Sequence, residues 1–223
     1  MNKTALLICS IFLLHACQND YIPREKISIS VKNFKIDSSS IRAIELLNDS
    51  TVVYAGSIGD IGIMSSAGIL KASQRVVYDS IIPHFRSVAA TKKAIFALSI
   101  ANPALLYKLK DNETSIVYLE ENENVFYDSM QFFDDLNGLA IGDPTQNCLS
   151  VILTDDGGNS WKKLNCEKLP VIMEGEAAFA ASNTNIAIVG TNAWIVTGGL
   201  NARVFHTSDM GYTWNVYDAC EYQ

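Results

Sequence analysis

The chain carries little charge and has no long stretch of helical periodicity. Charged residues make up 18% of its 223 positions, and the balance of acidic over basic residues gives a net charge of −7. No stripe of Lys or Arg is present, which argues against nucleic acid or an anionic membrane surface as a partner. Apolar residues alternate in short runs instead of recurring at helical spacing, so we expect an all-β chain.

Motifs for cofactors and metals are also lacking. The sequence contains no glycine-rich dinucleotide fingerprint, no Cys-x-x-Cys and no haem attachment motif. Beyond the N-terminal region the histidines are His84 and His206, and neither has a neighbour at metal-ligand spacing. No nucleophile–base pair stands out either. We therefore expect no cofactor, no metal site and no catalytic residues.

The N-terminus has the pattern of a secretory signal. Lys3 precedes the apolar run Ala5–Leu14, which is too short to span a bilayer. The run ends in LHAC, which resembles a bacterial lipobox, although His15 is unusual at its position. The resemblance implies a signal peptide over residues 1–16, lipidation of Cys17 and a tether over residues 17–25. An ordinary signal peptide with an incidental cysteine is the alternative.

A lipid anchor would place the protein in the bacterial cell envelope, at the outer membrane or the periplasmic face, with the anchor as its only membrane contact. In such an exported chain, cysteines are expected to pair. Cys148 and Cys166 are equidistant from Gly157, so two strands folding back there would bring them opposite each other. We expect a disulfide between them, which leaves Cys220 without an evident partner.

Two copies of one eight-residue pattern are the most informative feature present. TDDGGNSW and TSDMGYTW share Thr, Asp, Gly, a hydroxyl residue and Trp at the same spacing. The shared positions are Thr154, Asp156, Gly158, Ser160 and Trp161 in the first copy, and Thr207, Asp209, Gly211, Thr213 and Trp214 in the second. The pattern resembles the Asp-box, or bacterial neuraminidase repeat, which marks the turn between the two outer strands of a β-propeller blade.

The residue types suit a structural turn. The Asp can accept hydrogen bonds from backbone N–H groups within the turn, and the Gly supplies a positive φ. Ser or Thr can bond back to the turn, and Trp covers it with a large apolar face. A calcium loop is the rival interpretation, but Trp161 stands where such a loop needs glycine and the alternating acidic ligands are missing.

Four segments repeat at a blade-like spacing, each with a second strand that ends in small residues. The second strands read VVYAGS, AIFALS, GLAIGD and WIVTGG, and the third strands IGIM, ALLYKL, LSVILT and RVFHTS. We expect an all-β propeller over residues 26–223, with four-stranded antiparallel blades at about 40–82, 83–124, 125–172 and 173–220. The alternating segment Lys26–Val31 is the expected closing strand. About four blades are present, which predicts an incomplete larger propeller.

Across Tyr127–Trp214 the chain resembles the exported Asp-box propellers of Bacteroidetes, which are similar to the photosystem II stability and assembly factor propellers. The residues that carry this likeness are GLAIGDP, CLSVILTDDGGNSWKKL, FAASNTNIAIVG, AWIVTGG and ARVFHTSDMGYTW. Those assembly factors bind partner proteins and catalyse nothing, so the resemblance implies a non-catalytic binding or assembly module. Such relatives are often labelled oxidoreductases. A redox propeller with its cofactor site in a missing C-terminal part is therefore one alternative.

Sialidases share the Asp-box, so a glycan-acting hydrolase is the other alternative. Their sites need three arginines on a carboxylate, an Asp acid/base and a Tyr–Glu nucleophile pair. This chain has few arginines beyond residue 17 and lacks the Arg-Ile-Pro motif that opens sialidase sites. Only Asp128 and Glu176 could serve as paired carboxylates.

The starts of the four repeats are expected to lie together on one face, opposite the Asp-box turns. That face, with the turns after the second strands, would gather Arg42, Arg86, Asn102, Asp128, Asp143, Glu176 and Arg203. We expect these residues to bind an envelope protein or a small acidic or glycan ligand. The alternative is that neighbours such as Arg86 and Asp128 neutralise each other and hold adjacent blades in register.

Overall fold

The computed structural model describes residues 26, 28–178 and 183–219. The predicted signal peptide, the tether, Cys17 and Cys220 lie outside these residues. The chain divides into a unit up to Phe34 and a unit from Lys35 onward, and the described part of the first unit contains no strand. The predicted strand at Lys26–Val31 is therefore wrong for its described residues. Alternation indicates which side chains share a face, but a strand also needs a partner for its backbone hydrogen bonds.

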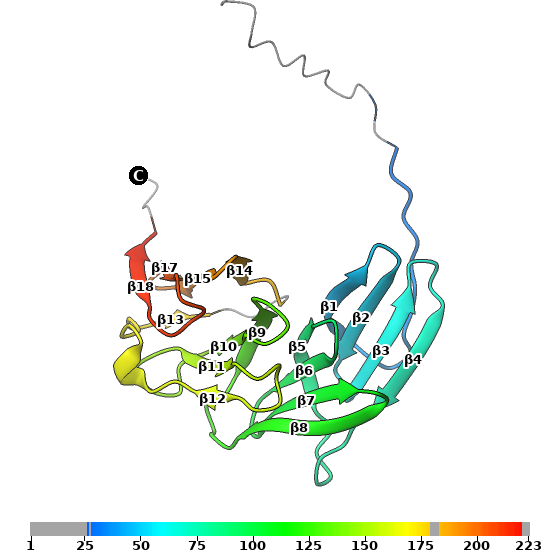
Figure 1. Ribbon diagram of the computed structural model, residues 1–223, viewed down its shortest axis with the longest axis horizontal. Helices are drawn as coiled ribbons and strands as arrows, with labels where there is room; N and C mark the ends of the chain where they lie inside the picture. Colours follow the sequence, from blue (N-terminus) through cyan, green and yellow to red (C-terminus); the bar gives the residue numbers. More distant parts are fainter. Residues whose placement is uncertain (1–25, 27, 179–182, 220–223) are drawn as a thin grey trace, which may run out of the picture. The chain divides into compact units, whose positions relative to one another are not determined.

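The unit from Lys35 onward is built from four-stranded antiparallel sheets in chain order (Figure 1). The first sheet consists of β1 (Ile41–Asn48), β2 (Thr51–Gly56), β3 (Asp60–Ser65) and β4 (Leu70–Arg75). The second consists of β5 (His84–Ala90), β6 (Ile95–Ile100), β7 (Ala104–Lys110) and β8 (Glu113–Glu120). Each strand pairs with the next one along the chain, so short turns suffice to connect them.

The third sheet has the same order, and the fourth departs from it. The third consists of β9 (Tyr127–Phe132), β10 (Gly138–Gly142), β11 (Ser150–Thr154) and β12 (Lys162–Lys163). The fourth consists of β14 (Ile186–Val189), β15 (Asn192–Val196), β17 (Arg203–Thr207) and β18 (Asn215–Asp218). Beside it, β13 (Glu176–Ala177) pairs with β16 (Gly198–Gly199), while a 3₁₀ helix, η2 (Cys166–Lys168), precedes β13.

Three apolar cores join successive sheets. Val53 of the first sheet packs with Phe85 and Leu105 of the second. Phe96 and Leu106 of the second pack with Met130 and Ile152 of the third, and a similar core joins the third sheet to the fourth. Fully burying a side chain of this size stabilises the fold by roughly 1.5–3 kcal/mol. These all-β sheets confirm the predicted fold class. No helix among the described residues is long and apolar enough to cross a membrane.

A buried amide ties the first strands of two sheets together. Asn183 precedes β14, yet its Oδ1 accepts hydrogen bonds from Ser87 Oγ at 2.6 Å and Met130 N at 3.3 Å. Its Nδ2 donates to the carbonyl oxygen of Val88 at 2.7 Å. Asn183 adopts a φ of 60°, a conformation that Asn tolerates better than most residues. The start of the fourth sheet therefore reaches both the second sheet and the third.

Candidate anion-binding site

Three of the predicted site residues occupy the same place in their sheets. Between β1 and β2 the pairing skips Arg42, between β5 and β6 it skips Arg86, and between β9 and β10 it skips Asp128. Each is the extra residue of a β-bulge, a feature that redirects a side chain away from the regular sheet face. Glu176 is different, because it pairs directly with Gly199 and no bulge is recorded there.

Arg42, His84 and Arg86 form a basic cluster at the starts of β1 and β5. Burial, then the positive charges of Arg86 and Arg42, lower the pKa of His84, so the imidazole is neutral at pH 7. The guanidinium of Arg86 lies 5.8 Å from the ring centre of Phe126. Two nitrogens in this cluster, Arg86 Nε and His84 Nε2, are buried without a hydrogen-bond partner among the described residues. Arg86 Nε can only donate a hydrogen bond, and an unsatisfied buried donor of this kind favours an anion as ligand.

The predicted residues Glu176 and Arg203 instead bind each other in the interior. Arg203 Nε donates to both carboxylate oxygens of Glu176 at 3.1 and 3.0 Å, and Nη2 donates to Oε2 at 2.6 Å. The same nitrogen donates to the carbonyl oxygen of Val171 at 2.7 Å, and Thr197 Oγ1 donates to Glu176. Burial raises the pKa of Glu176, but these hydrogen bonds and the Arg203 charge outweigh it and keep the pKa low. Both carboxylate oxygens of Glu176 and two of the three guanidinium nitrogens of Arg203 are therefore hydrogen-bonded within the protein.

Asp128, Asp143 and Asn102 are the remaining predicted residues. Asp128 is fully buried. Asp143 Oδ1 accepts a hydrogen bond from Ala178 N at 3.0 Å, and burial raises its pKa. Asn102 Oδ1 accepts from Asn122 N at 3.1 Å. Of the seven predicted residues, Arg42 and Arg86 are the two whose positive charges lower the pKa of His84. Sequence reasoning did not select His84.

The turn Thr154–Trp161, here called the first turn, is closed by one carboxylate. Asp156 Oδ1 accepts from Asn159 N at 2.8 Å and Ser160 N at 3.0 Å, while Oδ2 accepts from Ser160 Oγ at 2.7 Å. Thr154 Oγ1 donates to Asp156 and accepts from Gly158 N. Burial raises the pKa of Asp156, but these hydrogen bonds outweigh it and lower the pKa to about 2.

The second turn, Thr207–Trp214, repeats this arrangement. Asp209 accepts from Thr213 N at 2.9 Å and from Thr213 Oγ1 at 2.6 Å. Gly158 and Gly211 both have positive φ, and each lies against the preceding sheet. A Cβ on Gly158 would come within 2.3 Å of Phe96, and a Cβ on Gly211 within 2.8 Å of Leu153. The carboxylates of both turns are therefore hydrogen-bonded internally, and both glycines help to pack one sheet on the next.

The two tryptophans of the turns are placed differently. Trp161 is buried, and its ring packs edge-on against Phe96 and Phe132. Trp214 is half-buried and donates from Nε1 to the carbonyl oxygen of Gly211 at 2.8 Å. Both rings cover the turn while extending an intersheet core.

Cys148 and Cys166 form a disulfide, with Cα atoms 5.5 Å apart. Cys148 lies just before β11 and Cys166 opens η2 after β12, so the bond joins the two segments that flank this strand pair. The half-cystines also belong to the core between the third and fourth sheets.

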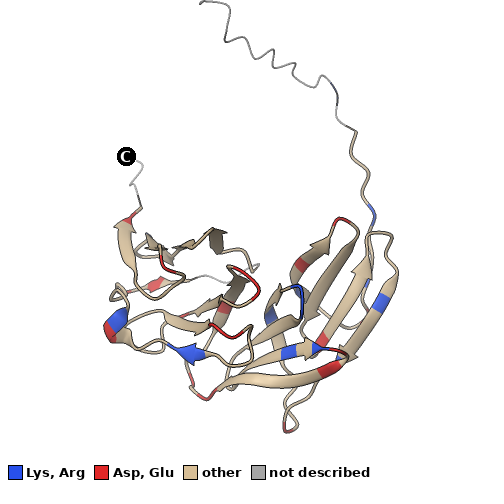
Figure 2. Cartoon of the chain, in the orientation of Figure 1, with Lys and Arg blue, Asp and Glu red and all other residues tan. Residues whose placement is uncertain are grey.

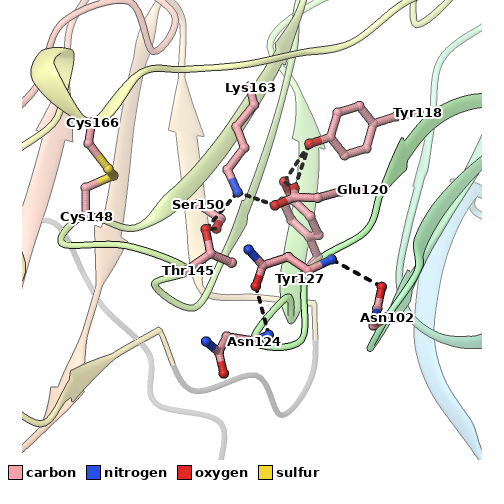
Figure 3. Close-up of polar contacts among 11 residues, drawn as sticks. Asn102, Tyr118, Glu120, Asn124, Tyr127, Thr145, Cys148, Ser150, Lys163 and Cys166 are labelled. Atoms are coloured by element: carbon pink, nitrogen blue, oxygen red, sulfur yellow. Dashed lines mark hydrogen bonds and ion pairs between the residues drawn. A yellow bond between two sulfur atoms is a disulfide. The ribbon is translucent and has the colours of Figure 1, made fainter.

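A polar cluster that sequence reasoning missed lies between the second and third sheets (Figure 3). Glu120 Oε2 accepts from Tyr118 Oη at 2.7 Å and Tyr127 Oη at 2.8 Å. Lys163 Nζ donates to Glu120 and, at 2.9 Å, to Thr145 Oγ1 (Figure 3). Burial raises the pKa of Glu120, but its three donors outweigh this and lower it. No motif signals this cluster, because its members come from separate strands.

This cluster contains a Tyr–Glu pair, the combination on which sialidases rely, but its setting differs. Tyr127 is fully buried. Burial, together with Tyr118 and Glu120, raises the pKa of Tyr127 well above its usual range. The phenol therefore stays protonated and hydrogen-bonded, which suits an internal tie between sheets better than a nucleophile.

Charged residues are interspersed over the sheets and turns, as Figure 2 shows. Within the part of the chain that the structure describes, no group of three or more His, Cys, Asp or Glu residues is arranged to hold a metal ion. The basic cluster at β1 and β5 contains two of the three buried nitrogens without a hydrogen-bond partner in the described part of the chain, and the third is Trp161 Nε1.

Comparisons with known proteins support the fold. No protein-family model and no curated protein sequence matches the chain. Among solved structures, YCF48 bound to D1 peptide superposes with a TM-score of 0.56 at 14% identity, over 83% of this chain and 55% of that one. The WD40 repeats of RRP9 give 0.54 at 14% identity, over 83% and 53%.

The extracellular domain of the putative one component system BT4673 from B. thetaiotaomicron gives 0.51 at 14% identity, over 80% of this chain and 22% of that one. The chain thus spans about half the length of the first two structures and less of the third. At these identities the comparisons establish the fold alone, which is that of a β-propeller built from four-stranded antiparallel blades.

Proposed function

We propose that this protein is an exported, lipid-anchored β-propeller of the cell envelope that binds a partner protein and catalyses no reaction. Its ligand group is a carboxylate, held by the basic cluster Arg42, His84 and Arg86. The single observation that carries this proposal is the Nε of Arg86, which is buried and has no hydrogen-bond partner among the described residues. A guanidinium presents its donors in a fork that fits a carboxylate.

Other observations agree with this proposal. Two arginines on neighbouring first strands both lie at bulges, so their side chains leave the regular sheet face together. His84 is neutral at pH 7 and can donate or accept one hydrogen bond. A structural neighbour at low identity, YCF48, is known in complex with a peptide. Peptide binding by a propeller of this kind is therefore a reasonable model for the chain.

Two further parts of the proposal, the Asp-box assignment and the lipid anchor, start from the sequence. We take the two turns to be Asp-boxes, because each has the shared residues and the same carboxylate-centred hydrogen bonds. Anchoring through Cys17 rests on the lipobox resemblance. The coverage of about half of the neighbouring structures is consistent with a propeller whose remaining blades lie elsewhere.

Capture of partners from envelope extract tests the proposed function. Replacing Arg42 and Arg86 together with Glu reverses the charge of the cluster and should abolish capture. Replacing Arg86 with Lys should also weaken capture, since an ammonium does not reproduce the bidentate geometry. Arg75→Glu is the matched control, because Arg75 is an exposed arginine at the end of β4 and should retain the partner.

Thermal unfolding must accompany this measurement. If the double reversal unfolds the protein, the arginines are supports between sheets and the binding proposal fails. If the variant is folded and captures the same partners as the original chain, the binding surface lies elsewhere.

A further inference from the structure

A cleft lies between the first and second sheets, at the place where the later sheet pairs hold a tryptophan. In the two later gaps, the turns Thr154–Trp161 and Thr207–Trp214 lie against the preceding sheet, and each adds its tryptophan to the intersheet core. The equivalent turn of the second sheet, between β7 and β8, is much shorter, because Lys110 pairs directly with Glu113. It therefore brings no tryptophan to the first sheet.

The register of the strands identifies the corresponding positions. Counted from the bulges in the first strands, Ile61 and Ile63 of β3 correspond to Val151 and Leu153 of β11. In the third sheet, the glycine of the second turn packs on Leu153. Trp214 lies beside Val151, and the space that they line has no room for a water molecule. The second turn thus fills the gap over these two positions.

Over Ile61 and Ile63 the corresponding space is open. It is a cavity of about 440 Å³, with Ile95 and Leu109 of the second sheet on its other side. Ala72 of β4 and the short turn between β7 and β8 complete its lining. An apolar cavity of about 150 Å³ already suffices to bind benzene. The cleft therefore has the apolar walls and the volume that an indole ring needs.

The cleft continues into a second lobe with lysines at its rim. This lobe has a volume of about 340 Å³ and shares part of its lining, including Leu109, with the first. Lys92, Lys93 and Lys110 line it, and all three are exposed. Lys92 and Lys110 each have a carboxylate at 3.9 Å, while no ion pair of Lys93 is recorded among the described residues. A free cation beside an apolar cavity favours a ligand with an acidic group next to its apolar part.

We propose that this cleft binds a tryptophan side chain of a partner peptide, with an acidic residue next to the tryptophan. The indole ring would lie over Ile61 and Ile63, as Trp214 lies beside the third sheet, and the acidic residue would lie at Lys93. The two connected lobes hold more than one ring, which favours a peptide over a free aromatic molecule. The proposal goes beyond the carboxylate site, because Lys93 follows the end of β5 and Arg86 lies near its start.

Isothermal titration calorimetry with the peptide acetyl-Gly-Ser-Trp-Glu-Gly-amide tests the proposal. We expect the purified chain to bind this peptide. Replacing the tryptophan of the peptide with alanine should weaken binding by roughly tenfold or more, since aromatic groups in a pocket dominate such contacts. If the alanine peptide bound equally well, or if the tryptophan peptide did not bind at millimolar concentration, the proposal would be wrong.

Ala72→Trp supplies an indole from the protein itself. Ala72 is exposed, pairs with Ile63 and lines the cavity. The variant should bind the peptide roughly tenfold more weakly or worse, because its own ring occupies the cleft. Its midpoint of urea unfolding should stay the same or rise, since the added ring buries apolar surface. Unchanged peptide binding, or a lower midpoint, would show that the cavity does not accept an indole.

The matched control is Ala67→Trp. Ala67 is also an exposed alanine, but it lies in the turn between β3 and β4 and lines neither lobe of the cleft. This variant should bind the peptide as the original chain does. If it lost as much affinity as Ala72→Trp, any added surface tryptophan would have the same effect and the proposal would fail.

Lys93→Glu tests the acidic part of the ligand. The variant should bind the original peptide severalfold more weakly, and it should prefer a peptide in which lysine replaces the glutamate. Lys162→Glu is the control, because Lys162 is an exposed lysine on β12 and lines neither lobe. Equal losses in the two variants would trace the effect to net charge and would remove the role of Lys93.

N-acetyltryptophanamide separates a peptide from a free aromatic molecule as the occupant. It should bind roughly tenfold more weakly than the peptide, because it reaches only the first lobe. Equal affinities would make a small aromatic molecule the ligand and would overturn the peptide. Calorimetry measures this site directly, so the result does not depend on partner capture through Arg42 and Arg86.

Discussion

Arg86 lies on the first strand of the second sheet and Arg203 on the third strand of the fourth, and both guanidinium groups lie over a phenylalanine ring. Their hydrogen bonding differs. Arg203 donates to Glu176 and to the carbonyl oxygen of Val171. Arg86 keeps a buried Nε with no partner among the described residues. The difference separates a structural arginine, saturated within the fold, from one with donors left for a ligand.

This contrast extends to acidic residues. Asp156 accepts hydrogen bonds from its own turn through both carboxylate oxygens. It therefore belongs with Arg203 and Glu176 as a saturated group. Changing a saturated group should lower stability and leave binding intact. Changing Arg86 should instead weaken binding and leave stability nearly unchanged.

Glu176→Ala should have the largest effect on stability. It leaves the guanidinium of Arg203 buried without a counterion, which typically costs about 3–5 kcal/mol. Urea unfolding monitored by circular dichroism measures the change in free energy. The double variant Glu176→Leu with Arg203→Met is the control, and it should recover most of the loss because no charge remains buried. If Glu176→Ala lowered the free energy of unfolding by less than about 1 kcal/mol, the pair of Glu176 and Arg203 would not stabilise the fold as a buried ion pair should.

Asp156→Ala should lower the free energy of unfolding by about 1–3 kcal/mol, because several turn donors lose their acceptor. Asp209→Ala should have an effect of the same sign, since its turn is built in the same way. Partner capture should be unchanged in both. A variant of native stability that no longer bound its partner would show that the turn takes part in recognition.

Acid should weaken the first turn in a defined range. The pKa of Asp156 is about 2 in the folded protein against an ordinary value of 3.8, so its ionised form stabilises the fold. That contribution is complete above about pH 4 and is lost as the pH falls towards about 2. In Asp156→Asn, the stability should depend less steeply on pH over this range than in the original chain. If the free energy of unfolding depended on pH with the same slope in both proteins, ionised Asp156 would not stabilise the fold.

Arg86→Ala should have the smallest effect on stability. The contact with Phe126 is worth less than about 1 kcal/mol, and no hydrogen bond is lost from Nε. Partner capture should nevertheless fall sharply. If instead this variant is as unstable as Glu176→Ala, then Arg86 is a structural residue and the contrast with Arg203 disappears.

The sequence predicts the strands well because their side chains repeat in type. The second strands end in small residues and the third strands are apolar, and β2, β3 and their equivalents lie in these segments. The turn pattern likewise leads to the carboxylate-centred turns. Pairing partners are harder to predict. The segment Lys26–Val31 alternates like a strand, yet its described residues belong to none.

Which residues share a site depends on the register of the strands, and the spacing of residues in the sequence reveals that register only in part. Arg42, Arg86 and Asp128 share a bulge, so their alignment by sequence corresponds to a real equivalence. Glu176 does not share it, because it lies on β13, which pairs with β16 in a separate two-stranded sheet. Glu120 lies on β8 without any motif around it. Its role depends on side chains that meet only after the sheets have packed.

Asn183 has a consequence for the order in which the protein is completed. The chain is synthesised from its N-terminus, so Ser87 and Val88 are made long before the residue that binds them. Until Asn183 arrives, these polar groups and the amide of Met130 have only water as a partner. A chain that ends before this position would therefore display open hydrogen-bonding groups along two inner strands. Those groups would distinguish incomplete molecules from complete ones for a protease that cleaves unfolded segments.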